Sequence, residues 1–281
     1  MRVLVAGAAG QLGRALQASA PAGVTIIAPA EAAFDITSPA AVAAAITAAA
    51  PDVVINAAAY TAVDKAEAEP ELAQRINAEA VAILAAHSPR LVQVSTDFVF
   101  PGTAHSPHRT DATPAPVSVY GRTKLAGEQA AGPQALIVRT AWVYAAQGGN
   151  FVHTMLRLMR ERDEVRVVAD QIGTPTHAAS LARALWSLIA VGASGLQHFT
   201  DAGTASWYDF AVAIQEEALA LGLLGRAVPV IPIRTEDYPT PARRPAYGVL
   251  DKTGTWAITG VPAHWRQELR LCLAELKALT A

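Results

Sequence analysis

Tyr120 and Lys124 are two residues whose types and spacing could carry out acid–base chemistry. They lie four positions apart in the segment VYGRTKLAGE, which has the pattern of an amphipathic helix, so both side chains project from one face, one turn apart. A phenol has a pKa of about 10, and an ammonium group within several ångströms favours its ionised form and lowers that pKa. The pair could therefore move a proton at the oxygen of a substrate that other residues bring there.

A glycine-rich turn near the start of the chain predicts a phosphate-binding loop. In VLVAGAAGQLGRAL, Gly7, Gly10 and Gly13 follow a short apolar strand and open a helix with Leu12 and Leu16 on its apolar face. Glycines permit a close approach of the backbone, and the first N–H groups of the helix point at a pyrophosphate. The spacing is that of the short-chain dehydrogenase/reductases rather than the G-x-G-x-x-G of other dehydrogenases, so we expect a nicotinamide dinucleotide.

The acidic residues that follow the second predicted strand leave the choice between NADH and NADPH open. An acid about 20 residues beyond the glycines commonly binds the ribose hydroxyls, and Glu31 and Asp35 are the candidates. Glu31 could equally be a solvent-exposed loop residue with no role in binding. Asp35 and Ile36 could pack behind the adenine ring. Between Arg14 and Lys65 there is no basic residue, so only Arg14 could clamp a 2′-phosphate.

Thr96 supplies a third polar group for the same site. The segment VQVSTDFVF ends a predicted strand with Ser95 and Thr96 at the carboxyl edge of a sheet, where ligands of nucleotide-binding folds sit. A hydroxyl there can orient a carbonyl group while Tyr120 transfers the proton and Lys124 holds the ribose beside the nicotinamide. With the glycine turn, these residues predict an oxidoreductase that uses NADPH or NADH.

The order of the predicted elements favours an α/β fold, a Rossmann-type doubly wound parallel sheet. Apolar strands are predicted over residues 2–7, 24–30, 52–59, 90–100 and 135–144, and helices over 35–50, 69–87 and 120–131. We expect residues 1–145 to form this NAD(P)-binding domain. Residues 146–281 are expected to form mainly a smaller mixed α/β substrate-binding lobe over the carboxyl ends of the sheet, with some segments free to return to the first domain. Its predicted helices span residues 150–162, 177–192 and 206–222.

Composition argues against nucleic-acid and membrane partners. The net charge is −2, the longest basic cluster is Arg243-Arg244, and the apolar run at residues 39–51 is too short to cross a bilayer. A strand that starts beside Met1 leaves no room for a cleavable signal, and the single Cys272 has no disulfide partner. We expect a cytoplasmic protein. The seven scattered histidines show no ligand spacing, so we assign no metal.

Nine segments along the chain together resemble the dTDP-4-dehydrorhamnose reductases, a family of extended short-chain dehydrogenase/reductases. The segments are GAAGQLGRAL, NAAAYTAVDKAEAEPE, STDFVFPG, YGRTKLAGE, RTAWVY, GNFVHTM, DQIGTPT, SWYDFA and YPTPARRP. The resemblance implies hydride transfer from NAD(P)H to C4 of dTDP-4-dehydro-L-rhamnose, the last step of dTDP-L-rhamnose synthesis. It also implies that Tyr120 is the proton donor, that Lys124 lowers its pKa and binds the ribose, and that Thr96 hydrogen-bonds the carbonyl.

Two further sets of residues complete the predicted site. The cofactor set, besides Tyr120 and Lys124, is Gly7, Gly10, Gln11, Leu12, Gly13, Glu31, Asp35, Ile36, Ala57, Ala58 and Ala59. The substrate set, besides Thr96, is Thr61, Val63, Asp97, Phe98, Trp142, Asn150 and Arg244. Within it, Arg244 could pair bidentately with a diphosphate or form an ordinary salt bridge, and Trp142 could stack on a substrate ring or cap the core.

Some positions depart from the family pattern. Phe98 stands where the family often has tyrosine, and Tyr247-Gly248 replaces a common Asn-Ser. Ala15 stands where some members have a glutamate for a magnesium-bridged dimer, so Mg²⁺ is not assigned and the state, monomer or homodimer, stays open. The alternatives are a related reductase that gives 6-deoxy-L-talose, a 4-epimerase, and a non-catalytic NADP-binding regulatory subunit.

Overall fold

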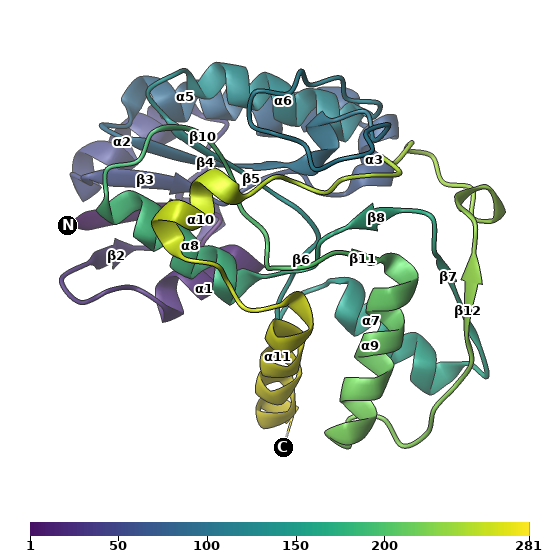
Figure 1. Ribbon diagram of the computed structural model, residues 1–281. Helices are drawn as coiled ribbons and strands as arrows, with labels where there is room; N and C mark the ends of the chain where they lie inside the picture. Colours follow the sequence, from purple (N-terminus) through teal and green to yellow (C-terminus); the bar gives the residue numbers. More distant parts are fainter. Residues whose placement is uncertain (281) are drawn as a thin grey trace.

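A six-stranded parallel sheet forms the centre of the molecule (Figure 1). This computed structural model describes residues 1–280. The strands lie in the spatial order β2, β1, β3, β4, β5, β10, and all neighbours are parallel. Their bounds are Arg2–Ala6 (β1), Thr25–Ile27 (β2), Val53–Asn56 (β3), Leu91–Thr96 (β4), Leu136–Thr140 (β5) and Gly195–His198 (β10). The strand order reverses at β1, so the crevice outside the carboxyl ends of β1 and β3 is where such sheets bind ligands.

Helices cover both faces of the sheet because successive residues of a strand point to opposite sides. From β1, Val3 and Val5 pack on one face with α1 and α8, whereas Leu4 and Ala6 pack on the other with α2, α5 and α6 (Figure 1). The bounds are Gln11–Ala18 (α1), Pro39–Ala49 (α2), Ala80–His87 (α5), Val119–Ala131 (α6) and Ala178–Ala190 (α8). The predicted doubly wound parallel sheet is confirmed.

The helix predicted over residues 69–87 is confirmed from Pro70 to His87, and it contains one π-helical turn. The chain forms α3 (Val63–Ala68), α4 (Pro70–Gln74), a π-helical segment η2 (Arg75–Glu79) and then α5. Pro70 can start a helix but cannot continue one, which separates α4 from α3. The buried Asn77 in η2 accepts a hydrogen bond from the Tyr60 N–H at 2.9 Å and donates one to Thr123 of α6 at 3.1 Å. These hydrogen bonds attach the π-helical turn to the loop after β3 and to α6.

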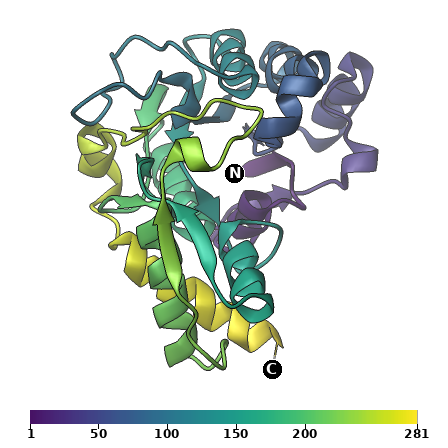
Figure 2. The same cartoon turned by 90° about the vertical axis from the view of Figure 1, so that its right-hand side faces the viewer.

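A second group of elements lies below the sheet (Figure 2). Helices α7, α9 and α11 share one apolar core, and β7 pairs in parallel with β12. The bounds are Phe151–Glu161 (α7), Val165–Val168 (β7), Trp207–Ala220 (α9), Val230–Ile233 (β12) and Trp265–Thr280 (α11). Two short pairs connect this group to the sheet, β6 (Val143–Tyr144) with β9 (Thr176–His177) and β8 (Ile172–Gly173) with β11 (Ala205–Ser206).

Three elements from the C-terminal half return to the sheet. Helix α8 packs against α1, strand β10 pairs with β5, and α10 (Thr253–Thr259) packs against both α8 and β10. The helix predicted over residues 177–192 therefore covers the sheet instead of lying in the smaller lobe. Short helical turns η1 (Glu31–Ala33), η3 (Asp97–Val99) and η4 (Thr235–Asp237) occupy the remaining loops. The boundary at residue 145 stays a prediction.

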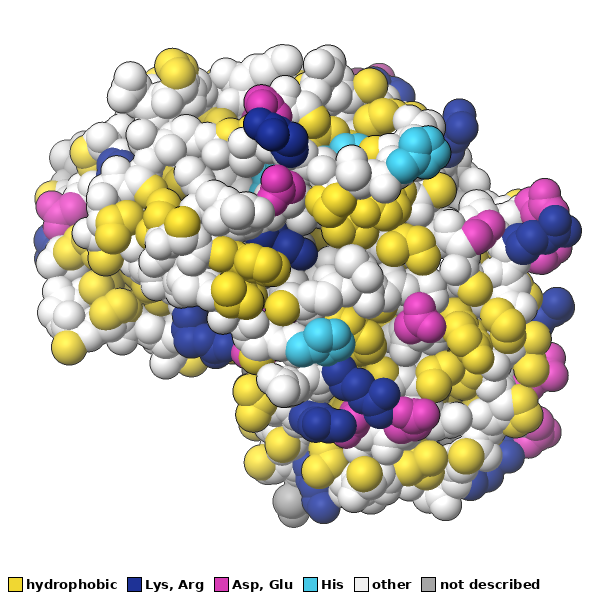
Figure 3. Space-filling model, viewed as in Figure 1, with side chains coloured by type: hydrophobic (Ala, Val, Ile, Leu, Met, Phe, Trp, Pro, Cys, Tyr) yellow, Lys and Arg dark blue, Asp and Glu magenta, His cyan; other side chains and the backbone are white. Residues whose placement is uncertain are grey.

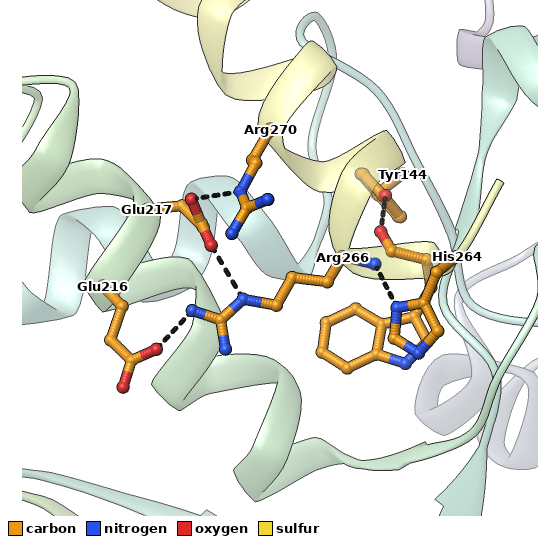
Figure 4. Close-up of polar contacts among 7 residues, drawn as sticks. Tyr144, Glu216, Glu217, His264, Arg266 and Arg270 are labelled. Carbon is orange, nitrogen blue, oxygen red and sulfur yellow. Dashed lines mark hydrogen bonds and ion pairs between the residues drawn. The ribbon is translucent and has the colours of Figure 1, made fainter.

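Helix α11 is attached to α9 by a network of ion pairs (Figure 4). The carboxylate of Glu217 accepts from Arg266 Nε and Arg270 Nε, each at 2.7 Å, and Arg266 also pairs with Glu216. On the opposite side of α11, the Tyr144 hydroxyl donates to the Trp265 carbonyl at 3.3 Å. The last helix is thereby fixed from two directions.

The surface carries charges of both signs. On the face shown in Figure 3, Lys and Arg side chains lie scattered among acidic and uncharged ones. None of the helices in residues 1–280 is long and apolar enough to cross a membrane.

One buried ion pair joins α6 to the two central strands beneath it. Arg139 of β5 forms a fork with Glu128 of α6, Nε to Oε1 at 2.8 Å and Nη2 to Oε2 at 2.6 Å. The Ser95 hydroxyl of β4 donates to the same carboxylate at 2.5 Å. The exposed fractions of the two charged side chains are 3% and 7%. Breaking such a pair from one side leaves an uncompensated buried charge.

We predict that Glu128→Ala lowers the free energy of unfolding by about 3–5 kcal/mol, because it strands the Arg139 guanidinium in the core. The matched control is Glu161→Ala, which removes an exposed i,i+4 pair with Arg157 and should cost less than about 0.5 kcal/mol. Urea unfolding of both variants measures the difference. Equal losses from the two substitutions would contradict the prediction.

Candidate active site

The three predicted catalytic residues come together at the carboxyl end of β4. Thr96 is the last residue of that strand, and α6 starts beside it with Ser118 as N-cap, whose hydroxyl accepts from the Gly121 N–H at 3.1 Å. A Cβ at Gly121 would lie 2.2 Å from the Phe98 carbonyl oxygen, so only glycine allows α6 to approach this closely. The Tyr120 and Phe98 rings meet edge-to-face, with centroids 5.4 Å apart.

Lys124 lies one turn further along α6 and is buried. Its Nζ donates a hydrogen bond to the Val94 carbonyl of β4 at 2.7 Å. Burial lowers the pKa of Lys124 to about 8, and the negative charge of Glu128 opposes this fall. The lysine is thus held against the strand that ends at Thr96.

Desolvation dominates the surroundings of Tyr120. Burial raises the pKa of Tyr120 to about 12, the hydrogen bond with Thr96 opposes the rise, and the nearby Asp97 carboxylate adds to it. In this structure desolvation dominates and the Lys124 ammonium donates to Val94, and the expected effect of Lys124 on the phenol stays a prediction. A phenol that keeps its proton at neutral pH is suited to donate it to a strongly basic oxygen.

The glycine turn forms a cradle that fits a dinucleotide. Gly7 has a φ of +73°, and a Cβ there would lie 2.6 Å from the Ala58 N atom at the end of β3. A Cβ at Gly13 would lie 2.2 Å from the Gly7 carbonyl oxygen. Helix α1 starts after Gly10 with no acidic residue in its first turn, so its N–H groups are available to an anion. Gln11 and Leu12 lie within this turn, and Ala57, Ala58 and Ala59 directly follow β3, where the backbone of Ala57 and Ala58 meets Gly7.

The acids expected at the ribose lie where β2 leaves the sheet. Glu31 is exposed in η1, and Ile36 is buried in the core below. The Asp35 carboxylate accepts from the Thr37 hydroxyl at 2.7 Å and from its N–H at 2.9 Å, which lowers its pKa. The charge of Arg75 on η2 adds to that fall, so a basic residue remote in sequence lies near this acid.

A small pocket opens beside the catalytic residues. It brings together four members of the predicted substrate set with residues that sequence reasoning missed. The lining residues are Asp97, Phe98, Trp142, Gln171, Ile172, Trp207, Arg244, Pro245 and Gly248. Gln171 lies in the DQIGTPT segment and Trp207 in the SWYDFA segment. Both segments carry the family resemblance, so both residues could have been predicted as part of the site.

Four members of the predicted substrate set, Thr96, Thr61, Val63 and Asn150, are not among the residues that line this pocket. Thr61 is exposed in the loop before α3, and Val63 is the first residue of that helix. Asn150 accepts from the His153 N–H as the N-cap of α7 and donates to Gln11 Oε1 at 2.9 Å. It therefore connects the second group of elements to the glycine turn. Contact of Thr61, Val63 and Asn150 with the substrate stays a prediction.

Arg244 is engaged by a carboxylate of its own chain. Its Nη2 lies 2.7 Å from Asp64 Oδ2 and its Nη1 3.1 Å from Asp64 Oδ1, and Nη1 also donates to Thr240 at 2.6 Å. This pair lowers the pKa of Asp64 and attaches the segment 240–248 to α3. Of the two roles considered for Arg244, the structure shows the salt bridge.

Trp142 forms one wall of the pocket in a strained conformation. Its φ is +47°, which is unusual for a bulky residue. Its indole stacks on Trp207, with centroids 3.5 Å apart and planes 8° apart. A Cβ at Gly173 would lie 2.6 Å from Trp142 Cε2. The ring is therefore clamped between β8 and the start of α9.

Comparison with known proteins identifies the family. A model of the RmlD substrate binding domain matches residues 1–278. The chain belongs to this family. It is 44% identical to the dTDP-4-dehydrorhamnose reductase of Burkholderia thailandensis over 98% of this chain and 99% of that protein. A crystal structure of a dTDP-4-dehydrorhamnose reductase from Clostridium acetobutylicum matches with a TM-score of 0.92 at 40% identity, covering 99% of this chain and 100% of that one.

A second solved structure bears on the cofactor. The dTDP-4-dehydrorhamnose reductase of Bacillus anthracis, in complex with NADP, matches with a TM-score of 0.91 at 36% identity, covering 98% of this chain and 99% of that one. The family resemblance predicted from nine sequence segments is confirmed.

For this RmlD family member we predict that Gly173→Ala disrupts the tryptophan stack, because the added methyl group meets the Trp142 ring. The coupled near-ultraviolet circular dichroism of the two stacked indoles should be lost. Gly254→Ala is the matched control, since a Cβ there meets no atom within 4 Å. If Gly173→Ala keeps the coupled signal, the Trp142 ring is not held tightly between β8 and the start of α9.

Proposed function

We infer that the chain reduces the C4 keto group of dTDP-4-dehydro-L-rhamnose to dTDP-L-rhamnose with hydride from NADPH or NADH. The observation that carries this conclusion is the juxtaposition of Thr96, Tyr120 and Lys124 with the glycine cradle and a pocket at the same sheet edge. The full-length similarity to dTDP-4-dehydrorhamnose reductases supports this substrate. The NADP complex of a relative supports the cofactor.

The residues of this chain then have separate tasks. The backbone of the Gly7–Gly13 turn would hold the pyrophosphate. Lys124 would hold the ribose next to the nicotinamide, and the nicotinamide supplies the hydride when bound. Tyr120 donates its phenolic proton to the sugar oxygen that becomes the alcohol. Thr96 hydrogen-bonds the same oxygen and keeps it near Tyr120.

The similarity to named reductases supports this activity over a 6-deoxy-L-talose-forming reductase or a 4-epimerase. Retention of Thr96, Tyr120 and Lys124 also speaks against a non-catalytic regulatory subunit, because a binding module needs no phenol. We propose in addition that the enzyme acts in the cytoplasm, as a monomer or homodimer, without nucleic acid or membrane partners. The net charge of −2 and the single cysteine support that setting.

Turnover with defined substrates tests the proposed function. The purified protein is mixed with dTDP-4-dehydro-L-rhamnose, supplied by a 3,5-epimerase, and either NADPH or NADH. Loss of reduced-nicotinamide absorbance with dTDP-L-rhamnose identified by NMR is the expected result. A C4-epimeric product, or no oxidation although the cofactor binds, would overturn it.

Tyr120→Phe should lower kcat by a factor of about 10² or more, because general acid catalysis is lost while the ring still packs. Binding of NADPH, measured by fluorescence, should persist. Tyr238→Phe is the control, since Tyr238 is 60% exposed and should leave kcat unchanged. Near-normal turnover by the Tyr120 variant would refute its role as proton donor.

Lys124→Met should weaken both turnover and cofactor binding, because it removes the ammonium group beside the ribose. Isothermal titration of NADPH into the variant measures the second effect. An unchanged dissociation constant would count against the ribose role, whatever happens to kcat.

A further inference from the structure

The pocket beside the proposed catalytic residues is too small for a sugar nucleotide. Its volume is about 30 Å³. Pockets that bind small molecules usually measure about 300–1,000 Å³. Three of its lining residues, Arg244, Pro245 and Gly248, come from a single loop. The proposed substrate can enter only if some of the lining residues move.

The loop that carries these residues contains a proline-rich strap, residues 239–245 (PTPARRP). Its three prolines have no N–H group, so the strap has few backbone hydrogen bonds to offer. Before the strap, Thr235 donates from its N–H and its hydroxyl to the Asp170 carboxylate. After the strap, the Gly248 N–H donates to the Ile172 carbonyl at 2.8 Å. The chain is therefore fixed on both sides of the strap.

Between those two sides, one carboxylate holds the strap. Asp64 of α3 accepts from the Ala242 N–H at 3.2 Å and from Nη1 and Nη2 of Arg244 at 3.1 Å and 2.7 Å. Within residues 1–280, no other residue outside the strap forms a hydrogen bond with it. Every polar contact between the strap and the rest of the fold thus depends on Asp64.

The ion pair between Asp64 and Arg244 is placed where it can open. The exposed fractions of the Arg244 and Asp64 side chains are 24% and 40%, so water and salt weaken the pair. A diphosphate carries more negative charge than one carboxylate, and a guanidinium group binds either with two parallel hydrogen bonds. A nucleoside diphosphate can therefore replace Asp64 on Arg244.

We propose that Asp64 is a latch residue for substrate entry. Through Arg244 it holds strap 239–245 closed over the pocket, and the diphosphate of the sugar nucleotide releases the strap by taking Arg244 from it. Asp64 does not line the pocket itself, so it acts through Arg244. The identity of the nucleotide rests on the proposed reductase function.

Equilibrium binding of dTDP and of thymidine to Asp64→Asn tests the latch. The substitution keeps the size of the side chain and an oxygen for the Ala242 N–H, but it removes the charge that holds Arg244. Because binding no longer has to break the ion pair, both ligands should bind about 3- to 10-fold more tightly than to the unaltered protein. Calorimetric titration of dTDP and ligand-observed NMR of thymidine measure the two dissociation constants.

Arg244→Gln separates release of the strap from recognition of the diphosphate, because it removes both the latch and the partner of the phosphate groups. Thymidine should bind more tightly to this variant, whereas dTDP should bind at least about 10-fold more weakly. If both variants weaken the binding of both ligands, Asp64 only positions Arg244, and the proposal is overturned. If Asp64→Asn tightens the binding of dTDP but not of thymidine, the carboxylate acts by its charge alone, which also overturns it.

Asp111→Asn is the matched control, since it removes one negative charge from a similar ion pair. Asp111 accepts from Arg109 Nε at 3.0 Å and from Arg109 Nη2 at 2.9 Å, and neither residue lines the pocket or belongs to the strap. The affinities of this variant for dTDP and thymidine should equal those of the unaltered protein. A gain as large as that of Asp64→Asn would follow from net charge and would overturn the proposal.

Turnover of the sugar nucleotide separates the latch from the proposed function. If the affinities follow the predicted pattern but dTDP-4-dehydro-L-rhamnose is not reduced, the proposed reductase function fails and the latch stands. If the sugar is reduced but Asp64→Asn binds dTDP no more tightly than the unaltered protein does, the latch fails and the reductase function stands.

Discussion

The carboxylate of Glu128 holds the catalytic helix on the sheet, and the geometry of the site depends on it. It accepts from Ser95 on β4 and from both arms of the Arg139 fork on β5, so one side chain of α6 is fixed to two strands at once. Tyr120 and Lys124 lie two turns and one turn before it on the same helix face. This buried interaction therefore fixes their positions relative to Thr96 together with the Lys124–Val94 hydrogen bond.

Burial also sets the protonation of the site. Desolvation raises the pKa values of Tyr120 and Asp97 and lowers that of Lys124, which favours the neutral form of all three groups. For the proposed reduction, this means that protons are available where an alcohol must form. The close packing that holds α6 on the sheet is thus also the cause of the acid–base properties.

Tertiary contacts explain what the sequence-based expectations missed. The helix over residues 70–87 contains a π-helical turn that the sequence pattern did not predict, and in it Asn77 pairs with Tyr60 and Thr123, partners that are 17 and 46 residues away in the chain. The pKa of Tyr120 was expected to fall on the basis of spacing to Lys124, but spacing carries no information on burial. Asp64, the carboxylate that pairs with Arg244, lies 180 residues away from it in sequence.

The sequence alone determined the parallel sheet, the glycine cradle and the identity of the proposed catalytic residues, because these follow from local patterns: apolar strands, a glycine spacing and a four-residue helical interval. Only the tertiary structure decided which residues meet at the pocket. Gln171, Trp207 and Gly248 come from three distant segments, and their convergence depends on how the second group of elements packs beneath the sheet. Folding likewise decided whether the pKa values of Tyr120, Asp97 and Lys124 rise or fall, since these groups lose water only in the folded chain.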